Sequence, residues 1–187
     1  MKTSASEDPA AHQPGARHAA GRSAVAAAVG EILARADADI AARKPVCNSS
    51  GRCCHFEEYG HRLYVTAAEL AFFAEAIGAP PAQGHSKEPG RPPAKSLPLP
   101  LFQPNGSVAA GCPFQVEGLC TARTARPLGC RIYFCDANAQ SWQGEVYERY
   151  HGELRALHER LGLPYAYTEW RNALAQLLEQ GVFRGRG

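Results

Sequence analysis

The sequence predicts a small single domain that is mainly α-helical, carries a small β element, and has cysteine-rich loops organised around a metal site. Three observations support this prediction. Apolar residues recur at helical spacing in several separate segments. One short segment has the composition of a strand. Seven cysteines, in a chain of 187 residues, fall into two groups rich in Gly and Pro.

The N-terminal part of the chain divides into a leader and a first helix. Residues 1–22 are small, polar and interrupted by Pro and Gly, so we expect a disordered leader, with the domain covering 23–183. Ser23 is a candidate N-cap for a helix. The apolar positions that recur at helical spacing after it are Val25, Val29, Ile32, Leu33, Ala36 and Ile40.

A strand followed by a second helix is expected after the first cysteine group. RLYVT (62–66) has strand composition. Thr66 followed by Glu69 forms a capping-box pattern, which indicates a helix start. Gly78 is a plausible end for this helix. Its apolar face is predicted to contain Leu70, Phe73, Ala74 and Ile77.

The middle and the end of the chain differ in character. Residues 79–100 contain seven prolines and predict an extended loop within the same domain. The pair Asn105-Gly106 is a hairpin signal. Apolar periodicity then predicts one helix from about Gln143 to Gly162 and another after Thr168.

Composition and charge narrow the function classes. The formal net charge is +2 and the basic residues are interspersed with acidic ones, which argues against a nucleic-acid surface. The N-terminal segment lacks the apolar run of a secretory signal, and no apolar run is long enough to span a membrane. We therefore expect a cytoplasmic protein with reduced thiols. Clustered cysteines in that setting indicate metal or redox chemistry before disulfides.

The cysteines form the candidate site. Thiolates are soft ligands that select zinc, copper(I) or iron–sulfur clusters. Neighbouring side chains in an extended backbone point in opposite directions. The adjacent pair in KPVCNSSGRCCHF (44–56) is therefore expected to serve two centres, or to pair one ligand with one buried or reactive thiol. The predicted ligands are Cys47, Cys53, Cys54, Cys112, Cys120, Cys130 and Cys135.

Two motifs resemble the YkgJ-type cysteine-cluster family, described as zinc- or iron-chelating proteins with the signature C-x-x-C-x-x-C-C. The first is CNSSGRCC (47–54), in which Ser50 stands where the second cysteine of the signature belongs. The second is CPFQVEGLCTARTARPLGCRIYFC (112–135), where Arg123 replaces an expected Tyr. One flagellin-methylating relative uses an iron–sulfur cluster. The resemblance thus implies such a cluster, of the [4Fe–4S] kind for example, or zinc.

Four further residues are assigned to the surroundings of the metal. Arg126 and Arg131 flank Cys130, where guanidinium groups would offset thiolate charge and donate hydrogen bonds to sulfur; structural salt bridges are the alternative. His55 follows the doublet and is a candidate nitrogen ligand or hydrogen-bond donor, or else an ordinary loop histidine. Ser50, a hard and weak ligand, does not fully replace a thiolate.

Three classes of function follow from these residues. The first is an iron–sulfur protein with a redox or group-transfer role. The second is a structural-zinc module that binds another protein without catalysing a reaction. The third is thiol redox chemistry or metal trafficking, although the chain lacks the C-x-x-C pair of a thioredoxin-like mechanism. The sequence shows no nucleophile with a base partner, so it leaves open whether the protein is an enzyme.

Overall fold

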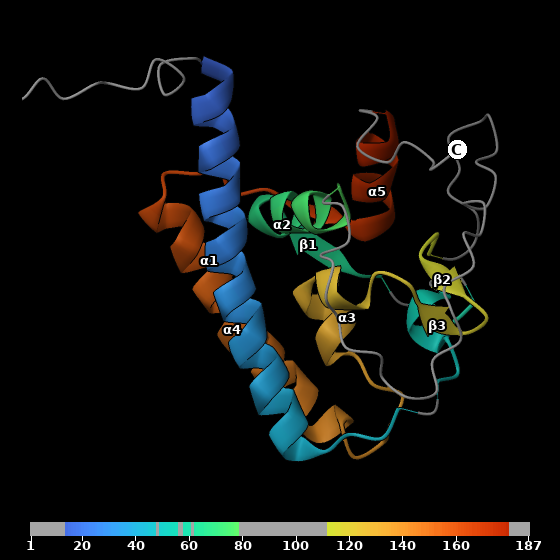
Figure 1. The fold of residues 1–187 in the computed structure, drawn as a ribbon. Coiled ribbons are helices and arrows are strands. Elements are labelled where there is room, and N and C mark those ends of the chain that lie inside the picture. Colours follow the sequence, from blue (N-terminus) through green and yellow to red (C-terminus); the bar gives the residue numbers. More distant parts are fainter. Residues whose placement is uncertain (1–13, 48, 56–57, 61, 79–111, 180–187) are drawn as a thin grey trace, which may run out of the picture.

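The computed structural model describes residues 14–47, 49–55, 58–60, 62–78 and 112–179, which form a mainly helical fold with two small sheets (Figure 1). The prediction of a mainly α structure with a small β element is confirmed. In chain order the elements are α1 (Pro14–Arg43), η2 (Arg52–Cys54), β1 (Tyr64–Thr66), α2 (Ala67–Gly78), β2 (Gln115–Val116), β3 (Leu119–Cys120), η3 (Arg123–Ala125), α3 (Leu128–Ile132), α4 (Gln140–Arg160), β4 (Tyr167–Glu169) and α5 (Trp170–Glu179).

Helix α1 starts nine residues before the predicted N-cap and includes residues 14–22, which the sequence pattern placed in the leader. Pro14 is the first helical residue, a position where its missing N–H costs nothing. The Ala-rich sequence that follows favours helix and extends it. Ser23 therefore lies inside α1, where its hydroxyl donates a 2.7 Å hydrogen bond to Glu75 of α2. The remaining leader, 1–13, lies outside the described residues.

The two sheets each contain two antiparallel strands. The predicted strand β1 pairs with β4, with Tyr64 opposite Glu169 and Thr66 opposite Tyr167. Strand β4 was not predicted, because three residues directly before a helix give too short a pattern. The hairpin predicted at Asn105-Gly106 and the Pro-rich segment both lie outside the described residues. A hairpin forms instead between β2 and β3, where Glu117 and Gly118 have φ of 49° and 79°.

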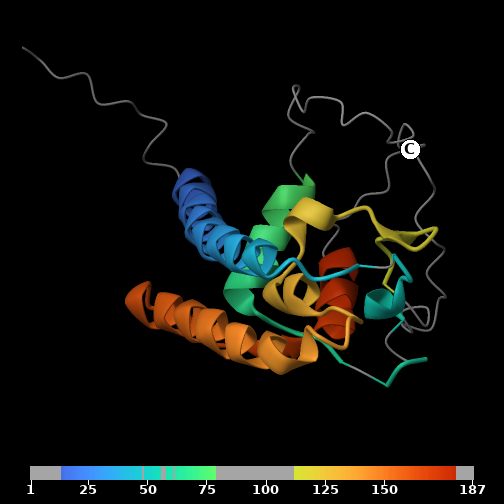
Figure 2. The ribbon, with the colours of Figure 1, turned by 90° about the horizontal axis from the view of Figure 1, so that it is seen from below.

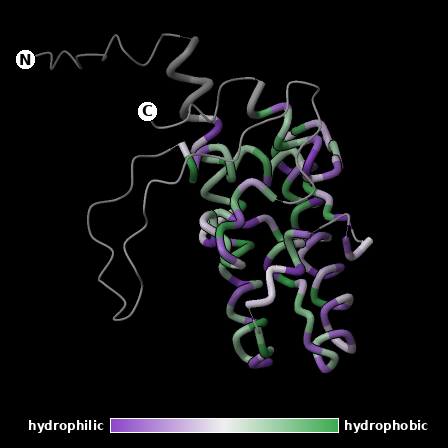
Figure 3. Tube along the Cα trace, turned by 90° about the vertical axis from the view of Figure 1, so that its right-hand side faces the viewer, coloured by the Kyte–Doolittle hydropathy of each residue, from purple (hydrophilic) through white to green (hydrophobic). Residues whose placement is uncertain are grey.

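One core lies between α1, α4, α2 and α3. Helices α1 and α4 run side by side along one flank of the molecule, as the views from the front and from below agree (Figure 2). Their facing sides are apolar and their outer sides polar, which gives the mixed colouring along each helix in Figure 3. The fully buried members include Val29, Leu33, Ala36, Val146, Leu154 and Leu157.

A second core lies beside the cysteine-rich loops. The Phe73 ring makes edge contacts with Trp170 and Phe114, at centroid distances of 4.8 and 5.2 Å. This core brings the apolar face of α2 against α5 and β1, as the predicted pattern on α2 requires. Three cysteines pack against the same cluster, namely Cys112, Cys120 and Cys130.

A buried carboxylate joins the two cores. Glu69 Oε2 accepts hydrogen bonds from the backbone N–H and the hydroxyl of Thr66, at 2.8 and 2.9 Å, which confirms the capping box. Its other oxygen accepts the N–H of Leu128, the first residue of α3, at 2.8 Å. Burial raises the pKa of Glu69, while these hydrogen bonds and Arg131 lower it in part. One side chain thus caps two helices.

His158 gives α2 a second contact at its start. Its side chain is almost fully buried in α4. Its Nε2 lies 3.4 Å from the Ala68 N–H, and its Nδ1 lies 3.1 Å from the Pro164 carbonyl oxygen. Nε2 therefore accepts a hydrogen bond while Nδ1–H donates one. This pairing ties α4 and the turn after it to α2.

Replacing Glu69 with Gln is expected to destabilise the protein by about 1–3 kcal/mol, because the amide NH2 must face a backbone N–H that the carboxylate now satisfies. The same change at the exposed Glu75 on α2 is the matched control and is expected to cost less than about 0.5 kcal/mol. Urea unfolding measures both.

The pH dependence of this difference has a definite sign. Because the pKa of Glu69 is raised in the folded state, its contribution is complete below the usual glutamate range and falls as the pH rises through the raised value. The gap between wild type and E69Q should therefore narrow with rising pH. A gap that widens would show that the carboxylate is stabilised as an anion.

Candidate metal centre

Five of the seven cysteines line one small cavity of about 30 Å³ next to the second core. They come from four separate segments of the chain. The aromatic rings of Phe73, Phe114 and Trp170 form the apolar part of the wall, and Arg126 is its charged part. The cysteines that line the cavity are Cys53, Cys54, Cys112, Cys120 and Cys130.

Local backbone contacts bring these segments together. The N–H of Cys112 donates to the carbonyl of Cys54 at 2.9 Å, which joins the two cysteine groups directly. Cys120 lies at the end of β3, and Cys130 lies in the single turn of helix α3. That turn starts at the N–H that Glu69 caps. The cavity therefore depends on the same contacts that hold the fold.

The adjacent pair does not diverge as the sequence predicted. Residues Arg52–Cys54 form a 3₁₀ turn in place of extended backbone, so both thiols line the same cavity. Their sulfur atoms are 3.9 Å apart. Tetrahedral zinc with Zn–S bonds of about 2.3 Å places its sulfurs about 3.8 Å from each other. The doublet therefore has the spacing of two ligands to one ion.

Gly51 makes this turn possible. It precedes the doublet with φ of 72°, a conformation that disfavours other residues. Its carbonyl accepts a 3.0 Å hydrogen bond from the Gln115 side chain. A Cβ added at Gly51 would lie 2.0 Å from Gln115 Nε2 and 3.3 Å from the Gly118 Cα atom. A side chain at this position would displace the Gln115 amide and cost its hydrogen bond to the Gly51 carbonyl, so glycine favours the docking of the first cysteine loop onto the β2–β3 hairpin.

Contacts among the thiols and their burial raise the pKa of several of them. The contact with Cys112, together with burial, raises the pKa of Cys54 to about 12. The contact with Cys54 is the largest cause of the raised pKa of Cys53, and burial is the second. Burial is the main cause of the raised pKa of Cys120 and of Cys130. Arg126 opposes the rise at Cys53, Cys120 and Cys130 through its positive charge. A metal cation would oppose it far more strongly.

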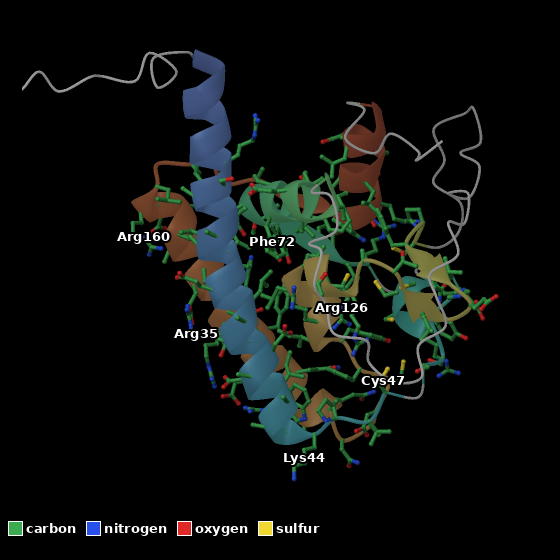
Figure 4. The ribbon with its side chains drawn as sticks, viewed as in Figure 1. Arg35, Lys44, Cys47, Phe72, Arg126 and Arg160 are labelled. Atoms are coloured by element: carbon green, nitrogen blue, oxygen red, sulfur yellow. The ribbon has the colours of Figure 1, made fainter. Side chains whose placement is uncertain are left out.

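The two predicted arginines have different contacts. Arg126 lines the cavity, and its guanidinium also donates to the carbonyls of Arg123 and Cys130, both at 3.1 Å (Figure 4). Arg131 is buried and forms an ion pair with Asp37. Its remaining N–H groups donate to the carbonyls of Thr124 and Arg126, both at 2.6 Å. Arg131 thus holds the loop that carries Arg126. Its ion pair with Asp37 is a structural salt bridge, which is the alternative to a role beside the metal.

The other predicted site residues lie outside the cavity wall. Cys47 and Cys135 are exposed. Ser50 lies beside Cys135, with its oxygen 3.8 Å from the sulfur. His55 lies at the surface, with Nδ1 3.2 Å from the Glu58 carboxylate. The structure therefore separates the seven thiols into a cavity group of five and an outer pair, Cys47 and Cys135, of which Cys135 lies beside Ser50.

Trp170 also belongs to the site. It lines the cavity and is 2% exposed. Its indole Nε1–H is buried and has no hydrogen-bond partner among the described residues. A buried donor without a partner is costly, and a thiolate or inorganic sulfide in the cavity would accept it. Its place at the start of a helix far along the chain gave no local signal of this role.

The thiols of the cavity are donors that suit a soft metal. Five thiols line the space together with Arg126 and apolar side chains, and no carboxylate of the described residues lines it. Within the described ranges, no three Cys, His, Asp or Glu side chains meet at the distances of a bound ion. For the cavity thiols to bind one ion, the side chains of cysteines other than Cys53 and Cys54 would therefore have to move.

Comparisons of the chain with protein-family models, with curated proteins and with solved structures find no match. The interpretation of the site therefore depends on its residues and their geometry.

Replacing Gly51 with Ala should disturb the doublet more than the same change at Gly162. Both glycines have positive φ, 72° and 61°, so both substitutions carry a similar backbone cost of about 1 kcal/mol. A Cβ at Gly162 meets nothing within 4 Å, whereas one at Gly51 collides with Gln115. The Gln115 amide can move away at the cost of its hydrogen bond to the Gly51 carbonyl, so we expect an additional loss of about 0.5–1.5 kcal/mol in G51A, measured by urea unfolding. Equal losses would mean that the docking of the loop contributes nothing.

Proposed function

We propose that the protein holds a thiophilic metal centre, an iron–sulfur cluster or zinc, in the cavity lined by Cys53, Cys54, Cys112, Cys120 and Cys130. The observation that carries this proposal is the convergence of these thiols, from four separate segments, on one space. Soft thiolates are the ligands of zinc sites and of iron–sulfur clusters, and both need about four of them. The proposed function is metal binding. The identity of the metal would distinguish an iron–sulfur protein from a structural-zinc module.

Two features of the cavity favour a ligand over simple packing. Buried cysteines that act only as small apolar residues need no charged neighbour. Here Arg126 faces the thiols, and its charge favours their ionised form. Trp170 adds a buried N–H without a described partner. Both groups would be satisfied by sulfur atoms that carry negative charge.

An iron–sulfur cluster is the leading form of this proposal. The resemblance to the cysteine-cluster family favours it, and a [4Fe–4S] cluster would take four of the five thiolates. Such a centre would supply redox or group-transfer chemistry. In the described residues no helix has the length and apolar character of a membrane span. A reducing compartment such as the cytoplasm would keep the thiols available for the metal.

Structural zinc is the second candidate, and one observation favours it. Cys112, Cys120 and Cys130 pack against the second core, so a metal there would cross-link β3, α3 and the η2 turn to that core. This is the arrangement of a small domain that gains folding energy from zinc. The protein would then act as a module that binds another protein and would have no catalytic activity.

Metal and acid-labile sulfide analysis, with a visible spectrum, tests the proposal on protein purified anaerobically without tags or chelators. Iron with sulfide and broad brown absorbance would establish the cluster. Stoichiometric zinc without colour would establish the second candidate. Protein that remains folded, free of both metals, and unable to take up either one would refute the proposed function.

Replacing Cys130 with Ser should remove most of the bound metal and lower the melting temperature, because a cavity ligand is lost. The matched control is the same change at Cys135, which is exposed and outside the cavity wall. We expect C135S to keep its metal and its melting temperature. Metal loss of equal size in both variants would contradict the separation into a cavity group and an outer pair.

The affinity for zinc should rise steeply with pH. Each cavity thiol with a raised pKa is protonated near neutral pH and must lose a proton to bind the metal. Each proton displaced contributes about a tenfold gain in affinity per pH unit below the thiol pKa. Competition with a chromophoric chelator between about pH 6 and 8, corrected for the protonation of the chelator, measures this. A flat profile would show that the ligands are already ionised.

A further inference from the structure

A second pocket lies beside the thiol cavity. Its volume is about 580 Å³, within the range of small-molecule sites. Its walls are the C-terminal part of α1, residues 44–47 and the η3–α3 segment. In Figure 4, Lys44 lies at the lower end of α1, and Cys47 and Arg126 lie above it on neighbouring segments. The pocket is separate from the thiol cavity, and Arg126 lines both.

Positive charge dominates this pocket. Four cations line it, and one carboxylate accompanies them. The carboxylate, Asp37, is already neutralised by its ion pair with Arg131, whose other N–H groups bind backbone carbonyls. Three cations then remain without a carboxylate in the pocket wall. These are Lys44, Arg123 and Arg126.

The side chains of Lys44 and Arg123 have N–H groups that are available to a ligand. Both are exposed, and neither has a hydrogen bond or ion pair with a side chain in the described part of the molecule. Their backbones are held in place: the Lys44 N–H donates to the Ala41 carbonyl at 3.1 Å, and the Arg123 carbonyl accepts from Arg126. Lys44 also offsets the partial negative charge at the end of α1. The two cations therefore come from different elements and face one pocket.

We propose that this pocket binds the carboxylate or phosphate group of a small anionic molecule. Guanidinium and ammonium groups are the side chains that recognise both kinds of anion. A simple solvated basic face would be convex or flat, whereas these cations surround a pocket with an apolar wall that includes Ile40 and Phe134. A ligand held there would lie next to the exposed Cys47 thiol and across Arg126 from the thiol cavity. This inference needs no metal, because the charges belong to the chain itself.

Isothermal titration with inorganic phosphate and with succinate, at fixed low ionic strength, tests this site on the full chain as purified. The informative variant is K44Q/R123Q. The control is R22Q/R160Q, which removes the same charge from two exposed arginines on α1 and α4 that do not line the pocket; Arg160 lies far from it in Figure 4. Melting temperatures and metal content are measured on every sample.

We expect saturable binding of at least one anion to the wild type, weakened about tenfold or more in K44Q/R123Q and changed less than about twofold in the control. Binding of phosphate alone or succinate alone would assign the class of anion. If the double variant melts early, the single variants K44Q and R123Q are used, and each should weaken binding.

Equal weakening in both double variants would overturn the proposal, since it would show attraction to net charge only. Absence of saturable binding of either anion to the wild type would also overturn it. These results are independent of the metal analysis. Protein without any metal can still show the anion site, and a metal-loaded protein can lack it.

Discussion

The buried carboxylate of Glu69 is the contact on which the remaining structure depends. It accepts hydrogen bonds from Thr66 at the start of α2 and from Leu128 at the start of α3. Helix α2 carries Phe73, which forms a wall of the thiol cavity, and α3 carries Cys130. A single side chain thus sets the distance between an apolar wall of the site and one of its thiols. Its burial has a cost, which the three donors offset in part.

The thiol cavity shows how short-range structure can assemble a long-range site. A 3₁₀ turn after Gly51 aligns two adjacent thiols, and one backbone hydrogen bond joins that turn to Cys112. The other thiols reach the same place on a hairpin and on one helical turn. None of these short elements has a hydrophobic core of its own, and Cys112, Cys120 and Cys130 pack against the second core. A bound metal would add the cross-link that such small elements lack.

The sequence predicted features whose signal is local and periodic. The capping box of α2, the strand before it and the two C-terminal helices follow from residue type and spacing. The features it did not predict depend on contacts between distant segments. Strand β4 exists because β1 pairs with it, and α3 is a single turn capped by Glu69. The direction of the two thiols in the doublet depends on the backbone turn at Gly51. The carbonyl of Gly51 accepts a hydrogen bond from the side chain of Gln115, which is distant in the sequence.

The proposed metal site and the proposed anion pocket would be coupled through charge. A metal centre bound by several thiolates carries net negative charge, so an anion close to it would be repelled. Arg126 lies between the proposed metal site and the proposed anion pocket, and Arg131 fixes its loop from behind. Lys44 and Arg123 line the pocket, and no carboxylate in its wall pairs with them. Arg126 and Arg123 favour the ionised form of Cys120, and the same positive charges, with that of Lys44, would attract an anionic ligand to the pocket.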